Sequence, residues 1–224
     1  DAHRTFIGLY CTDGTWYYYE NGEVNSDFTD LVLYNGTWYY VEDGVLNWNY
    51  TGLALHEGIW YQVKNGCVDW NYTGLSQIPD SQQWCYIEKG VQNKNSTGLV
   101  YYNKIWYYVQ NSVLDWNYTG LTLYNGTWYY VEKGCLNWGY SGLTRYNGTW
   151  YYIDHGVLNW KYTGLTYYVD CWYYVENGIL TWKYTGVTKY YGTWYYVQNS
   201  AINWKYSGTF TQNGHLYQIS YGIV

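Results

Sequence analysis

Tryptophan and tyrosine side chains recur along this chain at a fixed spacing, and their rings are the residues most able to hold a ligand. Nine tryptophans follow one another at steps of 22 residues, with a single step of 24, and one more step of 22 ends at Leu216. Aromatic rings present a broad apolar face on which a sugar ring can stack, and they attract quaternary ammonium groups through cation–π contacts. These anchor tryptophans are Trp16, Trp38, Trp60, Trp84, Trp106, Trp128, Trp150, Trp172 and Trp194. The spacing predicts that whatever one unit binds, the chain binds several times.

The composition favours ligand contact over simple core filling. Aromatic residues make up 25% of the chain, as 36 Tyr and 16 Trp against 3 Phe. Tyr and Trp combine an apolar face with a polar group, so they suit half-hydrated surfaces that meet a ligand. A second tryptophan follows most anchors at +10, so we expect grooves formed by anchors, second tryptophans and the second tyrosine of each WYY phrase. The candidate ligand-binding residues are Trp38, Tyr40, Trp48, Trp70, Trp106, Tyr108, Trp116, Trp128, Tyr130, Trp138, Trp150, Tyr152, Trp160, Trp172, Tyr174, Trp182, Trp194, Tyr196 and Trp204.

The elements that must position these rings are short strands. In the repeat Leu121–Gly142, Asn125-Gly126 separates two apolar segments, which predicts a β-hairpin with a type I′ turn. A Gly or Ser at +6 from the anchor ends the second strand. The sequence then alternates apolar and polar residues over 136–141, which predicts a third extended segment. No helical periodicity is present.

Alternation within the second strand predicts its two faces. The +3 position is aliphatic in nearly every repeat, as at Val131, and marks the core side. The +4 position is usually Glu or Gln, as at Glu132, and marks the solvent side, which Trp128 and Tyr130 would share. We also expect the pairs Trp128/Tyr130 and Trp138/Tyr140 to meet across neighbouring units.

The period decides the fold class. Self-similarity at this length indicates small units that stack into one continuous core. We predict an all-β, elongated solenoid of stacked β-hairpins, built from about ten 22-residue repeats. Residues 1–224 would form a single module with degenerate capping segments at about 1–30 and 209–224.

One repeat, over residues 76–99, departs from the pattern. It has a two-residue insertion near Pro79, Cys85 in place of a Tyr, Lys94 in place of the +10 Trp and Ser96 in place of the +12 Tyr. A repeat without these rings lacks an aromatic groove. We therefore predict that no ligand occupies the groove lined by Lys94 and Ser96.

The net charge argues against nucleic-acid binding, and the cysteine positions argue against a fold held by disulfides. The net charge of −6 argues against nucleic acid, which requires a basic surface. Residues 1–112 contain 5 Lys/Arg and 12 Asp/Glu, and residues 113–224 contain 6 and 5. This asymmetry would suit head-to-tail association, although drift among surface residues is the favoured interpretation. The five cysteines stand at positions that do not match between adjacent repeats, so no disulfide framework is indicated.

Nothing in the sequence indicates catalysis. The four histidines fall at unrelated repeat positions, and no Cys/His pair has metal-site spacing. No nucleophile motif or phosphate loop is present. We expect a non-enzymatic protein without a cofactor or metal. No apolar run is long enough for a membrane span and no signal peptide is visible. Because the chain begins at Asp1, we expect a processed product or an excised fragment.

The phrase NGTWYYV, followed by NG and TGL, resembles the cell-wall-binding repeats of Gram-positive bacteria, and the similarity covers essentially the whole chain. That superfamily includes choline-binding repeats, glucan-binding repeats of glucansucrases and the repeats of clostridial toxins. The resemblance implies a hairpin solenoid on a secreted protein, with ligand sites between consecutive hairpins. Here Leu replaces the Trp that choline-binding repeats usually carry after TG, so an intact choline cage cannot be carried over. The +10 tryptophans could replace the missing wall, unless they are fully buried.

We therefore predict multivalent, non-catalytic binding of a carbohydrate or cell-wall polymer through aromatic grooves. The partner would be a glycan or cell-wall polymer such as glucan, teichoic acid or a mucin-type chain, with end-to-end self-association as a further contact. The location would be extracellular or on the surface of a Gram-positive-type bacterium. The alternative is a structural stalk or self-assembling fibre subunit, in which the aromatic rings only hold hairpins together.

Overall fold

The computed structural model describes residues 6–224, and two compact units divide the chain: Asp1–Asp115 and Trp116–Val224. Residues 1–5, the start of the predicted capping segment, lie outside the described part. Each unit is described by itself, and the single module over residues 1–224 stays a prediction. All regular structure over residues 6–224 is β-strand, which confirms the predicted all-β class. This part of the chain therefore has no helix long and apolar enough to cross a membrane.

Unit 1 contains five antiparallel hairpins, each followed by a two-residue strand. The hairpins are β1 (Gly8–Thr12) with β2 (Thr15–Glu20), β4 (Asp30–Tyr34) with β5 (Thr37–Glu42), β7 (Gly52–His56) with β8 (Ile59–Lys64), β10 (Gly74–Gln77) with β11 (Trp84–Glu88), and β13 (Gly98–Tyr102) with β14 (Ile105–Gln110). The short strands are β3 (Glu23–Val24), β6 (Val45–Leu46), β9 (Cys67–Val68), β12 (Val91–Gln92) and β15 (Val113–Leu114).

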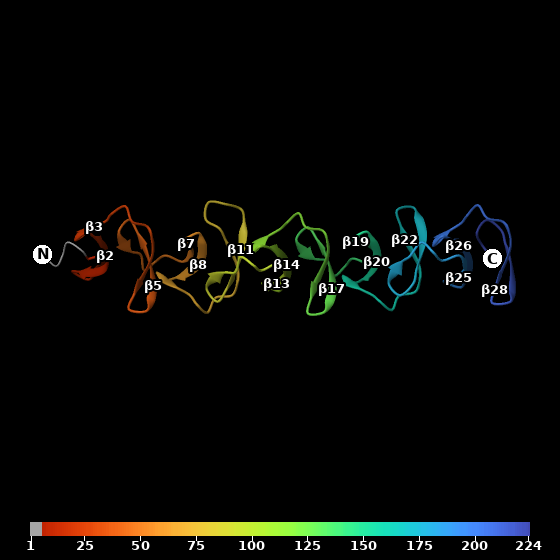
Figure 1. Ribbon diagram of the computed structural model, residues 1–224, viewed down its shortest axis with the longest axis horizontal. Helices are drawn as coiled ribbons and strands as arrows, with labels where there is room; N and C mark the ends of the chain where they lie inside the picture. The colour runs from red at the N-terminus through yellow and green to blue at the C-terminus, as the bar shows by residue number, and fades with distance from the viewer. Residues whose placement is uncertain (1–5) are drawn as a thin grey trace. The chain divides into compact units, whose positions relative to one another are not determined.

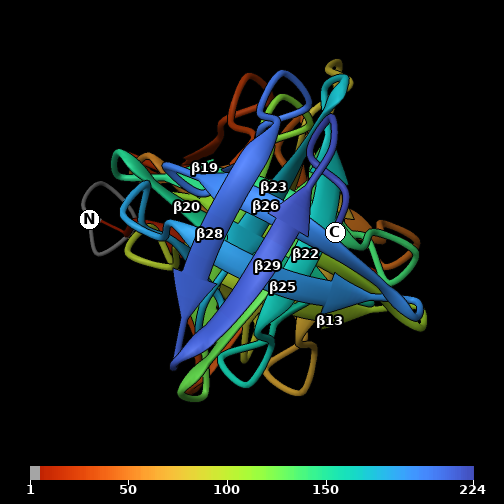
Figure 2. The same ribbon diagram turned by 90° about the vertical axis from the view of Figure 1, so that its right-hand side faces the viewer.

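Unit 2 also contains five hairpins in chain order (Figure 1), and a two-residue strand follows each of the first four. The hairpins are β16 (Gly120–Tyr124) with β17 (Thr127–Glu132), β19 (Gly142–Tyr146) with β20 (Thr149–Asp154), β22 (Gly164–Tyr168) with β23 (Cys171–Val175), β25 (Gly186–Tyr190) with β26 (Thr193–Gln198), and β28 (Gly208–Gln212) with β29 (His215–Ile219). The short strands are β18 (Cys135–Leu136), β21 (Val157–Leu158), β24 (Ile179–Leu180) and β27 (Ala201–Ile202). Figure 2 shows that β28–β29 and the preceding β25 run in different directions, so successive hairpins are rotated.

The turns form as the sequence predicts. Asn125 and Gly126 both have positive φ, 46° and 78°, which is the backbone of a type I′ turn. The register then places Tyr124 opposite Thr127 and Leu123 opposite Trp128. The hairpin prediction is therefore confirmed in this repeat.

Each short strand joins one repeat to the one before it. Strand β21 pairs with its own hairpin through Ile153 and Leu158, and with the preceding β17 through Tyr129 and Val157. The backbone N–H of Tyr130 also donates to the carbonyl of Gly156, at 2.8 Å. Backbone hydrogen bonds therefore connect consecutive repeats within each unit.

The core lies between consecutive hairpins. One cluster combines Leu121 and Tyr130 of one repeat with Ile153 and Leu158 of the next, and all four are at most 6% exposed. The same combination recurs, for example as Leu165, Tyr174, Val197 and Ile202. The predicted core position at +3 is confirmed, because Val41, Val63, Val109 and their equivalents are fully buried.

The predicted solvent face of the second strand is wrong for the second tyrosine. Tyr130 is only 6% exposed, although it lies on the opposite face from Val131. The physical reason is that an interior hairpin has two neighbours, so one face packs on the preceding repeat and the other on the following repeat. Glu132 at +4 is exposed, as expected.

The predicted extended segment over 136–141 is also wrong. Only Cys135–Leu136 is strand, and a turn follows at Trp138. The side chain of Asn137 explains this, because its Oδ1 accepts the N–H of Gly139 at 2.9 Å and its Nδ2 donates to Glu132 at 2.7 Å. Such a local hydrogen bond competes with a continuing strand and turns the chain.

The five cysteines are free thiols. Cys85 is fully buried, and this burial raises the pKa of its thiol to about 12. Cys67 and Cys135 also have a raised pKa for the same reason. These three cysteines pack as small apolar side chains.

Candidate ligand-binding grooves

An aromatic groove lies between consecutive repeats of unit 2. Trp128, Tyr146, Tyr151 and Trp160 line a cavity of about 290 Å³, together with Leu121, Leu158 and Asn147. The rings of Trp128 and Tyr146 lie 5.1 Å apart, and those of Tyr151 and Trp160 lie 5.8 Å apart. This cavity suits a small ligand group with an apolar or cationic surface.

Different elements bring these rings together. Trp128 belongs to β17 of one repeat, while Tyr146 ends β19 and Tyr151 lies in β20 of the next. Trp160 follows the short strand β21. One groove therefore needs two consecutive repeats, and stacking creates it.

A side-chain turn positions Trp160. The Oδ1 atom of Asn159 accepts the N–H of Lys161 at 3.0 Å, and its Nδ2 atom donates to Asp154 at 3.3 Å. These contacts end the short strand, so the next side chain points away from the core. Trp160 is 50% exposed as a result, with one part of the indole against Tyr151.

The tyrosine at +12 packs beneath the groove of its own anchor, so Tyr162 lies beneath the next groove, which contains Trp150, Tyr168 and Tyr173. The ring of Tyr162 stacks on Tyr152 with centroids 3.7 Å apart, and its hydroxyl donates to the carbonyl of Leu165. Burial raises the pKa of the Tyr162 hydroxyl, so this group stays protonated and able to donate at neutral pH. The stacked pair therefore has a structural role.

The same groove recurs within both units. Each copy has an anchor Trp, an aromatic ring four residues before the next anchor, the first Tyr of the next WYY phrase and the next +10 Trp. The copies are Trp16/Tyr34/Tyr39/Trp48 and Trp38/His56/Tyr61/Trp70 in unit 1, and Trp150/Tyr168/Tyr173/Trp182 and Trp172/Tyr190/Tyr195/Trp204 in unit 2. The first ring pair of these copies is 4.8 to 5.1 Å apart.

The irregular repeat of unit 1 lacks this geometry. Beside Trp60, the aliphatic Ile78 and the buried Cys85 stand where other repeats have aromatic rings. Lys94 replaces the +10 Trp, and its ammonium group donates to the carbonyl of Gly58 at 2.6 Å. A lysine cation therefore stands where the other copies offer an indole ring.

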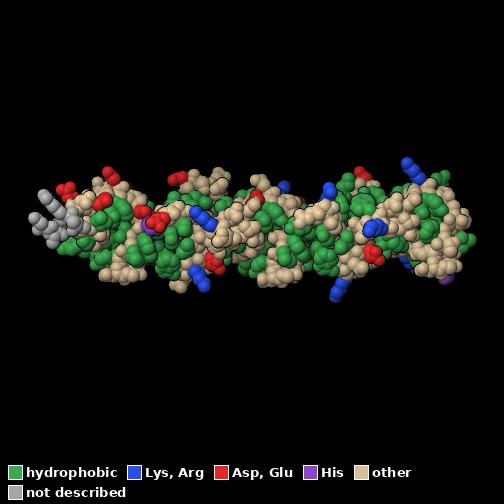
Figure 3. All heavy atoms as spheres, in the orientation of Figure 1, with side chains coloured by type: hydrophobic (Ala, Val, Ile, Leu, Met, Phe, Trp, Pro, Cys, Tyr) green, Lys and Arg blue, Asp and Glu red, His purple; other side chains and the backbone are tan. Residues whose placement is uncertain are grey.

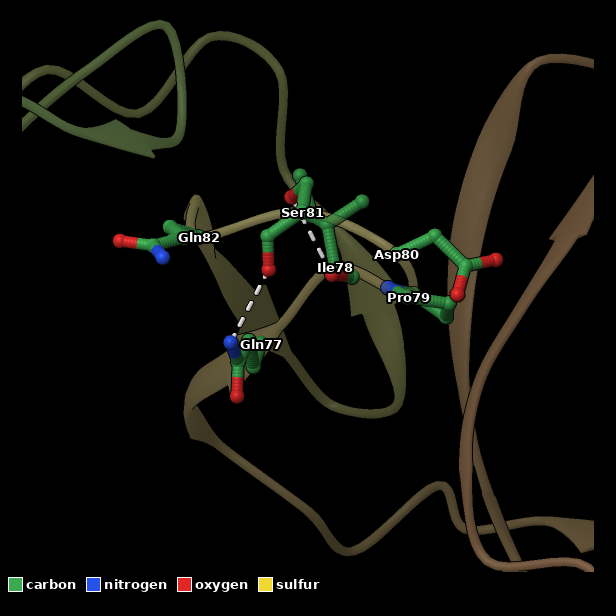
Figure 4. Close-up of a pocket in the computed structure, with 6 residues that line it drawn as sticks. All are labelled: Gln77, Ile78, Pro79, Asp80, Ser81 and Gln82. Atoms are coloured by element: carbon green, nitrogen blue, oxygen red, sulfur yellow. Dashed lines mark hydrogen bonds between the residues drawn. The ribbon is translucent and has the colours of Figure 1, made fainter.

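The inserted loop next to this groove forms a polar depression of about 560 Å³ (Figure 4). Ser81 holds the loop, since its hydroxyl donates to the carbonyl of Ile78 at 3.2 Å and its carbonyl accepts the Gln77 amide at 2.9 Å. The depression is lined by Gln77, Ile78, Pro79, Asp80, Ser81 and Gln82. It has no aromatic side chain, so it does not share the chemistry of the grooves.

The predicted binding residues fall into three groups in the structure, namely the +10 tryptophans, the anchor tryptophans and the second tyrosines. The +10 tryptophans all keep a large exposed surface. They are therefore not fully buried, which is what a role as a groove wall requires. Their exposed fractions lie between 44% and 52% for Trp48, Trp70, Trp116, Trp138, Trp160, Trp182 and Trp204. The anchors named from sequence are half-buried, namely Trp38, Trp106, Trp128, Trp150, Trp172 and Trp194.

The second tyrosines lie beneath the groove, in contrast to the prediction. Their exposed fractions are at most 9%, except that Tyr152 is half-buried; the set is Tyr40, Tyr108, Tyr130, Tyr174 and Tyr196. The predicted aromatic pairs also differ. Tyr130 stacks on Tyr140 within its own repeat, and Trp128 meets Tyr146 of the next one.

Sequence reasoning missed two groove positions. The first Tyr of WYY, such as Tyr151, faces the groove and meets the +10 Trp. The ring four residues before the anchor, such as Tyr146, forms the wall opposite. Its recurrence as Tyr34, Tyr146, Tyr168 and Tyr190 was visible in the sequence and is the signal that could have identified it.

On the face drawn in Figure 3, hydrophobic and other uncharged side chains cover most of the surface, and charged side chains are scattered. Lys161 and Lys205 directly follow +10 tryptophans, and Lys189 lies 6.0 Å from the ring centre of Trp194. Over residues 6–224, no group of three His, Cys, Asp or Glu side chains is arranged to hold a metal ion.

Comparison with known proteins identifies the repeat. A sequence model described as a choline-binding repeat matches residues 5–25, 27–47, 49–69, 95–115, 117–137, 139–159, 161–181 and 183–203. The unmatched stretch from residue 70 to 94 covers most of the irregular repeat. No curated protein sequence matches the chain.

Several solved structures are similar in fold. CbpJ from Streptococcus pneumoniae TIGR4 is 20% identical over 98% of this chain and 88% of its own, with a TM-score of 0.36. Choline binding protein F from Streptococcus pneumoniae, solved with a peptidoglycan analogue, is 22% identical over 97% of this chain and 86% of its own, with a TM-score of 0.33. Alternansucrase in complex with isomaltononaose is 16% identical over 97% of this chain but only 16% of its own, with a TM-score of 0.33.

Likenesses at these identities and TM-scores do not by themselves define a ligand. The repeat match rests on the sequence and covers well over half of the chain in eight tandem copies. The chain therefore belongs to the choline-binding repeat family.

Proposed function

We propose that the chain is a non-catalytic, multivalent binding module for a bacterial cell-wall polymer, and that its grooves accept quaternary ammonium groups of the choline type. The observation that carries this proposal is the lining of the groove. Trp128, Tyr146, Tyr151 and Trp160 supply aromatic surface, and the side chain of Asn147 and the tyrosine hydroxyls are the polar groups beside it.

The chemistry of this lining favours a cation over a sugar ring. A quaternary ammonium group has no hydrogen-bond donor or acceptor, so it loses none when it leaves water. Aromatic faces attract it with about 0.5 to 2 kcal/mol for each cation–π contact, depending on desolvation. A sugar hydroxyl would need several polar partners, because an unpaired polar group is costly to bury.

Several copies of the groove make a polymer the suitable partner. A ligand group held by a single cage binds weakly, and linking many such groups raises the overall affinity by about 10² to 10⁴ when the geometry permits. A wall polymer that displays choline repeatedly would satisfy this requirement. We place the module outside the cell on these grounds.

Titration of intrinsic tryptophan fluorescence with tetramethylammonium, choline and an isomalto-oligosaccharide tests the proposal. We expect saturable responses to both ammonium compounds, and we expect Trp160→Ala or Trp128→Ala to remove part of each response. Tyr221→Ala is the matched control, since it removes an exposed ring (73% exposed) outside these grooves.

Each alternative has its own outcome. A response to the oligosaccharide alone would replace the ammonium ligand by a glycan. Silence towards all three ligands and towards wall polymer, in a stably folded chain, would favour the structural role in which the rings only join hairpins.

A further inference from the structure

Two unusual residues meet in one groove of unit 1. The residue eight positions before the anchor is glycine in the other regular repeats, such as Gly52 and Gly142, but it is Asp30 before Trp38. The residue four positions before the anchor is usually tyrosine, as at Tyr146, but it is His56 before Trp60. The two departures occur in consecutive repeats, and His56 belongs to the groove of Trp38, Tyr61 and Trp70.

The two side chains contact each other. Nδ1 of His56 lies 2.9 Å from Oδ1 of Asp30, with the side chains 19% and 33% exposed. Asp30 also accepts the N–H of Leu31 at 2.6 Å, which holds the carboxylate in place. The pair is therefore a built feature of the groove, partly shielded from solvent.

The imidazole of His56 forms a wall of the groove. Its centroid lies 5.0 Å from that of Trp38 and 6.2 Å from that of Tyr61. Tyr146 occupies the equivalent place 5.1 Å from Trp128 in unit 2. The groove of Trp38, His56, Tyr61 and Trp70 thus has an imidazole ring at the position where the other aromatic copies of the groove have a phenol.

The groups around the imidazole determine its response to pH. Asp30 faces it from β4 and Tyr61 from β8, while Trp38 on β5 is uncharged. Glu57 is its neighbour in the turn after β7. Imidazole is the ordinary side chain that changes its charge between pH 5 and 8, and His56 is the imidazole of this groove.

We propose that Asp30 and His56 are specificity-determining residues that make cation binding in this one groove depend on pH. The inference rests on the proposed ammonium-binding function. With His56 neutral, the Asp30 carboxylate adds a negative charge beside the aromatic cage and favours a cation. With His56 protonated, an imidazolium stands in the wall of the cage and opposes a second cation.

Linkage determines the expected sign. A quaternary ammonium ligand that prefers the neutral imidazole stabilises it, so His56 must lose its proton at lower pH when the ligand is present. Conversely, the affinity of this groove for the ligand falls as the pH is lowered from 8 to 5. We expect a decrease of about tenfold, which is typical of a local charge change in a partly buried site.

Nuclear magnetic resonance of the histidine rings in the full chain tests the inference. The ring signals are followed between pH 5 and 8 with saturating tetramethylammonium chloride or with sodium chloride at equal ionic strength. We expect the His56 titration to move to lower pH. His155 is the internal control, because it also pairs with an aspartate (Asp154, 2.7 Å) but is 84% exposed and lies outside the groove linings.

Substitutions separate the roles of the two residues. His56→Tyr restores the usual ring and should make cation binding in all grooves independent of pH over this range. Asp30→Asn keeps the shape but removes the charge, so affinity at pH 8 should fall while the pH dependence persists. Equal behaviour of His56 and His155, or unchanged pH dependence in His56→Tyr, would overturn the inference.

The same measurement distinguishes failure of this inference from failure of the proposed ammonium-binding function. If tetramethylammonium perturbs the Trp150 and Trp182 indole signals but not the titration of His56, only this inference is overturned. If it perturbs no indole signal at all, the ammonium-binding function falls and the inference falls with it.

Discussion

At the scale of single residues, the second tyrosine of most WYY phrases stacks on the tyrosine ten positions later. Tyr130 and Tyr140 have centroids 4.0 Å apart, and the Tyr140 hydroxyl donates to the carbonyl of Leu143 at 2.5 Å. The strand alternation suggested that Tyr130 faces solvent. The following repeat covers that face, and only a three-dimensional arrangement reveals it.

Buried tyrosines predict a specific loss of stability at high pH. Burial, with smaller effects from Tyr130, Tyr168 and Glu132, raises the pKa of Tyr140 from 10.0 to about 12. The folded state therefore favours the neutral phenol. Its stabilising effect is complete below pH 10 and is lost as the pH rises from 10 towards 12, because the unfolded chain then ionises first.

Denaturant unfolding at several pH values between 8 and 12 measures this loss, and we expect the free energy of unfolding to decline above pH 10. Tyr140→Phe removes one of the groups responsible, so its decline should be shallower. At pH 7 the same variant should be less stable by about 1 kcal/mol, since the Leu143 carbonyl loses its donor. A decline that is equally steep in the variant would contradict the role of Tyr140.

At the scale of elements, the Gly or Ser that follows the second strand of a hairpin, at +6 from the anchor, joins two repeats. Its role in ending the strand was visible in the sequence, whereas its contact with another repeat was not. The carbonyl of Gly66 accepts the N–H of Tyr40 at 2.8 Å, and the N–H of Gly66 donates to the backbone carbonyl of Tyr50 at 3.0 Å. A Cβ atom there would lie 2.7 Å from the carbonyl oxygen of Asn47.

Gly66→Ala and Gly58→Ala form a matched pair that tests this contact. Both glycines have a φ near +75°, but a Cβ on Gly58 would meet no atom within 4 Å. We expect about 1 kcal/mol of destabilisation in Gly58→Ala from its backbone conformation. Gly66→Ala should lose about 1 to 3 kcal/mol more, because its methyl group overlaps the preceding repeat. Chemical denaturation measures both, and equal losses would show that the repeats can separate slightly at no cost.

At the scale of the whole molecule, the proposed binding function depends on how many grooves can accept a ligand. The sequence predicted that the repeat with Lys94 and Ser96 holds no ligand, and this stays a prediction. The structure adds a physical reason, since the Lys94 ammonium donates to Gly58 beside Trp60 and would repel a cation.

Counting binding sites by calorimetry with tetramethylammonium tests the closed groove. Trp128→Phe should weaken one site and lower the apparent number of sites, whereas Trp60→Phe should leave the number unchanged. Binding of a choline-bearing polymer should be more sensitive to Trp128→Phe than binding of the free ligand, because avidity multiplies the contributions of the grooves. A lower number of sites in Trp60→Phe would show that Lys94 does not close its groove.

The sequence by itself determined the repeat, the hairpins and their turns, and the aliphatic core position at +3. Each of these depends on local patterning, since a period of two defines strand faces and Asn-Gly defines a turn. It also identified the indoles that line the grooves, because their spacing follows the repeat.

Tertiary structure alone decided which rings line the grooves. Tyr146 and Tyr151 come from a different repeat than Trp128, and the burial of Tyr130 follows from contact with that same repeat. The contact of His56 with Asp30 likewise joins residues 26 positions apart. A hairpin in a stack has a neighbour on each face, so residues on both faces can be buried, and strand alternation cannot tell which of them stays open to a ligand.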